Sequence, residues 1–134
     1  MGNAILDKQL VITAGNKVGT LAEVTNVVSS SGINLVAICA YGVDNKGVIM
    51  FVSDNNNQAK KLLKAKKYDV REEEVILTTL DNKPGALQAI AKKISAAGID
   101  LNLIYGSVDK SGKTSRVVII SEDNNGIMAI MNMH

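Results

Sequence analysis

The chain has 134 residues, of which 46% are hydrophobic and 21% are charged, and its formal net charge is +2. This length accommodates one compact domain or two very small ones, and the composition is unlike that of a disordered chain. The longest apolar run, at residues 35–41, is far shorter than the roughly 20 residues of a membrane helix. One Cys and one His leave few groups for catalysis. We therefore expect a soluble, cytoplasmic binding protein, and neither an enzyme nor a membrane protein.

In the first half, the predicted elements follow the order strand, helix, strand, strand, helix, strand. The β-branched segment at residues 9–14 is typical of a strand, while Leu21, Val24 and Val28 recur at helical spacing. Gly32 ends that helix. The later elements are expected at residues 33–41 and 48–53 (strands joined by a turn at 44–47), 58–66 (a helix) and 68–71 (a strand).

The second half repeats this order as far as its second helix. Its elements are expected at residues 74–80 (strand), 87–94 (helix), 99–105 and 116–121 (strands joined by a turn at 109–112) and from 123–125 onward (helix). No residues remain for a fourth strand. Either the chain is shortened, or the N-terminal segment or a partner chain fills that sheet edge, because unpaired edges are a liability.

An internal repeat relates the two halves. At an offset of 66 residues, eight of the twenty residues between positions 16 and 35 are identical. Two βαββαβ copies predict an α+β fold with two ferredoxin-like modules in tandem, each an antiparallel sheet with helices on one face. We expect the modules at residues 1–72 and 73–134, with an acidic, solvated junction at 72–74 and the last strand of the second module missing.

The loop between the first strand and the first helix of each module is a candidate ligand site. Pro84 fits a first helical turn, and Gly85 lets a ligand approach the main chain closely. The first N–H groups of a helix lack partners within it and lie at the positive end of its dipole, where a carboxylate or phosphate can dock. Turn formation without any ligand explains the same residue types and stays an alternative.

The run from Asn82 to Leu87, followed after the helix by Gly-Ile-Asp at 98–100, resembles the signature of ACT domains. The resemblance covers residues 9–71 and 74–134 and extends to stand-alone tandem ACT proteins. It implies a non-catalytic, allosteric regulatory protein that binds an amino acid at the module or subunit interface, without a cofactor or a metal. By position, the implied ligand-binding residues are Asn16, Val18, Gly19, Thr20 and Asn34 in the first module and Asn82, Pro84, Gly85, Ala86, Leu87 and Asp100 in the second.

Three strand segments predict burial on both faces of the sheets. Residues 35–40, 48–52 and 117–120 lack the alternation of a half-exposed strand. Modules placed side by side would leave the face without helices open, so we expect a homodimer through sheet faces or edges. Folding of the two modules onto each other is the alternative. The regulatory interpretation also suggests a metabolic enzyme as a partner.

Other functions of this topology lack the residues that they need. The strands offer few aromatic side chains for stacking bases, and the lysine-rich segment 60–67 is typical of a solvated helix face, so no nucleic acid is expected. The single Cys39 leaves no Cys pair for a metal carrier. The competing hypothesis is a protein-interaction or oligomerisation module that acts without a ligand.

Overall fold

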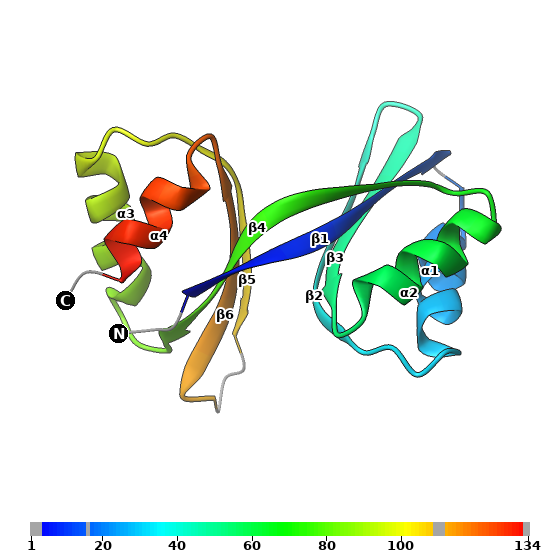
Figure 1. The fold of residues 1–134 in the computed structure, drawn as a ribbon, viewed down its shortest axis with the longest axis horizontal. Coiled ribbons are helices and arrows are strands. Elements are labelled where there is room, and N and C mark those ends of the chain that lie inside the picture. The colour runs from blue at the N-terminus through cyan, green and yellow to red at the C-terminus, as the bar shows by residue number, and fades with distance from the viewer. Residues whose placement is uncertain (1–3, 16, 109–111, 133–134) are drawn as a thin grey trace. The chain divides into compact units, whose positions relative to one another are not determined.

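The computed structural model describes residues 4–15, 17–108 and 112–132 (Figure 1). The elements are β1 (Ala4–Gly15), α1 (Thr20–Ser29), β2 (Leu35–Val43), β3 (Lys46–Ser53), α2 (Asn56–Ala65), β4 (Asp69–Asp81), α3 (Ala86–Ala96), β5 (Leu101–Val108), β6 (Thr114–Ser121) and α4 (Asn124–Met131). The strand order is β2-β3-β1-β4-β6-β5. Within the described ranges, no helix is long and apolar enough to cross a membrane.

The chain divides into two compact units, which are called the first and second units here. The first comprises Lys8–Glu73, and the second comprises Met1–Asp7 together with Glu74–His134. Both β1 and β4 contribute residues to each unit, so the strand order is β2-β3-β1-β4 in the first and β5-β6-β4-β1 in the second. Two helices cover one face of the strands in each unit (Figure 1). The predicted α+β, ferredoxin-like class is confirmed.

The strand missing from the end of the second module comes from the beginning of the chain. Residues 4–7 of β1 belong to the second unit. Ala4 packs against the core of that unit. Of the three explanations that the sequence allows, the structure supports the one in which the N-terminal segment fills the sheet edge.

The predicted acidic junction lies within one long strand. The sequence predicts strands at residues 68–71 and 74–80, but β4 is continuous from Asp69 to Asp81. The boundary between the units falls between Glu73 and Glu74, and Glu72 and Glu74 are exposed, as predicted. Each of the three glutamates also has a partner within its own unit: Lys60 for the Glu72 carboxylate (3.2 Å), the Gln9 amide for the Glu73 carboxylate (2.7 Å) and the Asn124 amide for the Glu74 carbonyl oxygen (3.2 Å).

Each unit has its own hydrophobic core between its helices and its strands. In the first unit, Val24, Val28, Ala59 and Leu63 from the helices meet strand residues such as Phe51. The second unit repeats this packing with the following buried residues: Ile76, Leu80, Ile90, Ile94, Val117, Ile119, Ile127 and Met131. The helical periodicity of the sequence therefore identifies the buried residues Val24, Val28, Ile90 and Ile94 of the first helices. It is wrong at the start of each predicted stripe, because Leu21 and Leu87 are 48% and 49% exposed.

Apolar side chains on the other face of the central strands are buried as well. Val11, Val52, Val75 and Val118 are at most 2% exposed in the single chain. The predicted burial is thus confirmed for residues 48–52 and 117–120. The prediction is wrong for residues 35–40, because β2 is the end strand of the order and Ile38 is 42% exposed.

Candidate functional site

A glycine in a left-handed conformation begins the first helix of each module. Gly19 precedes α1 with a φ of 91°, and Gly85 precedes α3 with a φ of 87°. This region of φ favours glycine, since other residues place a Cβ against the main chain. A Cβ at either position would meet no other atom within 4 Å. The space beside each helix N-terminus is therefore open.

A pocket of about 400 Å³ lies beside this loop in the second module. The ends of β4 and β5, the start of β6 and the first turn of α3 form its walls. Leu80, Ile104 and Val117 supply apolar surface, and the loop supplies Asp81, Asn82 and Lys83. A second pocket of about 250 Å³ shares Ala86 and adds Pro84 and Gly85. The predicted loop residues of the second module, from Asn82 to Leu87, thus surround two adjoining hollows.

The loop of the second module carries both signs of charge. Lys83 Nζ lies 3.8 Å from Asp81 Oδ2, and both side chains are largely exposed. Asn82 Nδ2 donates a 2.9 Å hydrogen bond to the carbonyl oxygen of Gly112, and its main-chain N–H donates to that of Lys113 at 2.9 Å. Asn82 therefore fastens the loop to the segment before β6, which is a role that the sequence did not reveal.

The first module has a pocket of about 250 Å³ at the equivalent place. Lys17, Gly19, Thr20 and Leu21 line it together with residues of β2 and β3. Val18, in contrast, is fully exposed and does not line this pocket. The predicted residue Asn16 lies outside the described residues.

Asn34 and Asp100 lie at the other end of their modules. In the first unit, Gly15 and Val43 both pair with Lys46, whereas Leu35 pairs with Ser53. The residue that precedes β2 is therefore at the opposite end of the strands from the loop that follows β1. The second unit has the same arrangement, since Asp81 pairs with Thr114 and Leu101 with Ser121. Neither module brings its predicted ligand-binding residues to one place.

Both residues have different surroundings from the loops. Asn34 lines a separate groove of about 460 Å³ along α1, and its main-chain N–H donates a 3.0 Å hydrogen bond to Asp54 Oδ1. Asp100 is exposed and lines neither pocket at the second loop.

Several pocket residues were not among the sequence-based candidates. These are Leu80, Asp81, Lys83, Ile104, Tyr105, Gly106, Ser107, Ser115 and Val117. Asp81 and Lys83 flank a predicted residue and could have been found from the loop alone. Ser115 enters the pocket because it pairs with Leu80, and this register across β4 and β6 has no local signal in the sequence.

The site offers no evident metal chemistry. In the part of the chain that is described, no group of three or more His, Cys, Asp or Glu side chains could hold a metal ion. Cys39 is only partly buried, and the chain has no second cysteine with which it could form a disulfide.

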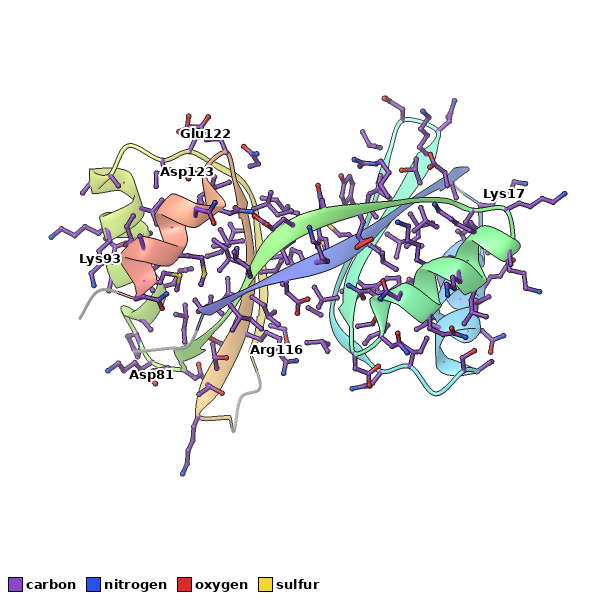
Figure 2. The ribbon with its side chains drawn as sticks, in the orientation of Figure 1. Lys17, Asp81, Lys93, Arg116, Glu122 and Asp123 are labelled. Atoms are coloured by element: carbon purple, nitrogen blue, oxygen red, sulfur yellow. The ribbon has the colours of Figure 1, made fainter. Side chains whose placement is uncertain are left out.

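Figure 2 shows the side chains of Lys17 and Lys93 extending away from their ribbons.

Comparison with known proteins identifies the family. A family model described as an ACT domain pair matches residues 5–130. The chain belongs to the ACT domain pair family. No curated protein sequence matches it.

Solved structures of similar fold include regulatory subunits. Protein BT0572 from Bacteroides thetaiotaomicron is 29% identical, with a TM-score of 0.88 over 96% of this ACT domain pair and 88% of that chain. The regulatory subunit of aspartate kinase from Thermus thermophilus, in its ligand-free form, is 13% identical, with a TM-score of 0.67 and coverages of 96% and 95%. The Thermus flavus counterpart is 14% identical, with a TM-score of 0.64 and coverages of 96% and 93%. The family and this fold support a regulatory, ligand-sensing role in general terms.

Proposed function

We propose that this ACT domain pair is a non-catalytic, cytoplasmic sensor that binds an amino acid at the loop before α1, at the loop before α3, or at both. The observation that carries the proposal is the second-module pocket, where Asp81, Lys83 and the start of α3 meet. A free amino acid carries an ammonium and a carboxylate. The Asp81 carboxylate suits the ammonium, while Lys83 and the positive end of the α3 dipole suit the carboxylate.

The family resemblance implies that a ligand contacts the loop together with Asn34 or Asp100, and such a ligand would need modules of two subunits. Each module holds its loop and its Asn34 or Asp100 at opposite ends, so one ligand can contact both only if a second module supplies one of them. A homodimer in which the loop of one subunit meets the start of β2 or β5 of its partner satisfies this requirement. Ligand binding would then stabilise the dimer, because the two equilibria are coupled.

A metabolic enzyme is the partner that we propose for this sensor. Two of the structures of similar fold are regulatory subunits of aspartate kinase. A chain of this fold can therefore act as a separate regulatory subunit, and the proposal extends that role to an enzyme of amino-acid metabolism here.

Isothermal titration calorimetry of the full chain with each of the twenty amino acids tests the proposal. We expect at least one of them to bind, and Gly85→Ala to weaken that binding by about tenfold or more. Gly98→Ala is the matched control, because Gly98 is also left-handed, with a φ of 71°, and also has open space around it, but it lies beyond the other end of α3. If none of the twenty binds, the sensor interpretation is wrong and the ligand-independent interaction module takes its place.

A further inference from the structure

We infer that the pockets beside the loops before α1 and α3 differ in function. An amino acid with an aliphatic side chain binds in the pocket of the second module, and the pocket of the first module stays empty. This inference rests on the proposed function and specifies its ligand class and its stoichiometry. It follows from comparing the two pockets position by position.

The two pockets occupy the same place in their modules but offer different polar groups. Asp81 in the second corresponds to Gly15 in the first, since each ends the strand before the loop. Ser115 corresponds to Gly47, because each pairs with the residue before that strand end, Leu80 and Ala14 respectively. The carboxylate of Asp81 and the hydroxyl of Ser115, which could accept hydrogen bonds from a ligand's ammonium, are thus replaced by glycine in the first pocket, whose described lining keeps only the hydroxyls of Thr20 and Tyr41 as side-chain acceptors.

Because of these replacements, the charged groups that line the two pockets differ. Among the described lining residues of the first pocket there is no carboxylate. A ligand ammonium placed there would lose water without gaining an opposite charge, which is unfavourable. In the second pocket, the carboxylate of Asp81 lies 3.8 Å from the ammonium of Lys83, so both charges of an amino acid have a counterpart. The second pocket is also larger, at about 400 Å³ against about 250 Å³.

The remaining walls of the second pocket determine the class of side chain. Leu80 and Val117 are 4% and 7% exposed, and Leu87 and Ile104 are 49% and 39% exposed. These four aliphatic side chains all line the pocket. An aliphatic ligand side chain would gain roughly 25 cal/mol for each Å² that it removes from water against these four side chains, while a charged or hydroxylated one would lose hydration there, because they offer no hydrogen bond.

A matched pair of variants separates the two pockets. Leu87 and Leu21 are each the second residue of their helix, each line their own pocket, and are 49% and 48% exposed. Calorimetric titration with valine, leucine, isoleucine and methionine, and with serine, lysine and glutamate, should give the tightest binding for an aliphatic member and one ligand per chain. Leu87→Lys should weaken that binding about tenfold or more, and Leu21→Lys less than about twofold.

Three results would overturn this inference and leave the proposed function standing: two ligands per chain, equal weakening by both leucine variants, or tightest binding of a polar or charged amino acid. Absence of binding by all seven would overturn the inference, and the full set of twenty would then decide the proposed function. Should Leu87→Lys fail to fold by circular dichroism, Asp81→Gly replaces it. Asp81 is exposed, and the substitution gives this position the glycine that the first module has at Gly15. We expect it to weaken binding by the same factor of about ten.

Discussion

Asn56 Nδ2 donates a 2.8 Å hydrogen bond to the main-chain carbonyl oxygen of Lys8. The side-chain oxygen of the same residue accepts hydrogen bonds from the main-chain N–H of Ser53 at 3.0 Å and from its hydroxyl at 2.6 Å. The second unit repeats the arrangement with Asn124, Ser121 and the carbonyl of Glu74. In each unit, one asparagine therefore links the end of a strand, the start of a helix and another strand.

Replacing either asparagine should lower the stability of the chain. Asn56→Ala and Asn124→Ala each remove these bonds and leave partly buried partners unsatisfied, which costs about 1–3 kcal/mol in the free energy of unfolding. Urea denaturation followed by circular dichroism measures this. Asn57→Ala is the control, since Asn57 is the next residue of α2 and is exposed. Equal losses for Asn56→Ala and Asn57→Ala would contradict the assigned role.

The beginning of β1 should support the second unit. Ala4 packs against the core of that unit, whereas the neighbouring Ile5 is 52% exposed. A carboxylate at position 4 would have to leave water without a partner, so Ala4→Asp should destabilise the second unit by about 1–3 kcal/mol.

Amide hydrogen exchange locates this effect. With Ala4→Asp, we expect the protection of α3 and α4 to fall more than that of α1 and α2, and we expect Ile5→Asp to change neither strongly. A loss of protection confined to α1 and α2 would show that residues 4–7 do not stabilise the second unit.

The left-handed glycine before α1 should be needed for stability. Gly19→Ala puts a Cβ at a φ of 91°, which costs about 1–2 kcal/mol although nothing crowds the position. Gly15→Ala is the comparison, because Gly15 is in β1 without a positive φ, and the nearest atom to its added Cβ, Lys17 Cε, is 3.8 Å away. Thermal unfolding should place the midpoint of Gly19→Ala below that of Gly15→Ala.

Tyr68 should make the stability of the first unit depend on alkaline pH. Its hydroxyl donates a hydrogen bond to the Glu23 carboxylate, and this bond, followed by burial and by repulsion from the same carboxylate, raises the pKa of Tyr68 to about 12 from 10.0. The folded chain holds the proton more tightly than the unfolded chain. The contribution is therefore complete below pH 10 and is lost as the pH rises towards about 12.

Two measurements check the tyrosine. Glu23→Gln should bring the pKa of Tyr68 back towards its ordinary value in a spectrophotometric titration of tyrosinate. Tyr68→Phe should make the loss of stability between pH 10 and about 12 less steep in urea denaturation. If the free energy of unfolding of Tyr68→Phe falls as steeply between pH 10 and about 12 as that of the unaltered chain, this hydrogen bond does not contribute to the loss of stability at alkaline pH.

Local patterns in the sequence predict much of the fold. The spacing of Val24 and Val28 identifies the buried face of α1, and Gly32 ends that helix with a φ of 75°. The turn after β2 lies where it is predicted, although it comprises only Asp44 and Asn45 and not all of residues 44–47, with Asp44 at a φ of 55°. Such features depend on residues a few positions apart, so a single sequence contains the information.

Features that depend on distant pairing were missed or left open. Glu72 and Glu74 are exposed, as their charge predicts, but the run at 72–74 is strand and not a break between strands, because it is part of β4, which lies between β1 and β6. The predicted grouping of Asn34 with Gly19 ignored the direction of β2, which places them at opposite ends. The loop motif itself was located correctly, but the walls of its pocket follow from strand register, which no short motif contains.

Because β1 is shared between the units, this chain is a circular permutation of one in which two complete modules follow one another. Read from Lys8 onward, the first unit is a complete βαββαβ module that ends at Glu73. The second module begins at Glu74, and the segment Met1–Asp7 at the other end of the chain completes it. A permuted chain that begins at Lys8, with a flexible linker from the C-terminus to residues 1–7, would therefore contain two uninterrupted modules and the same strand neighbours within each.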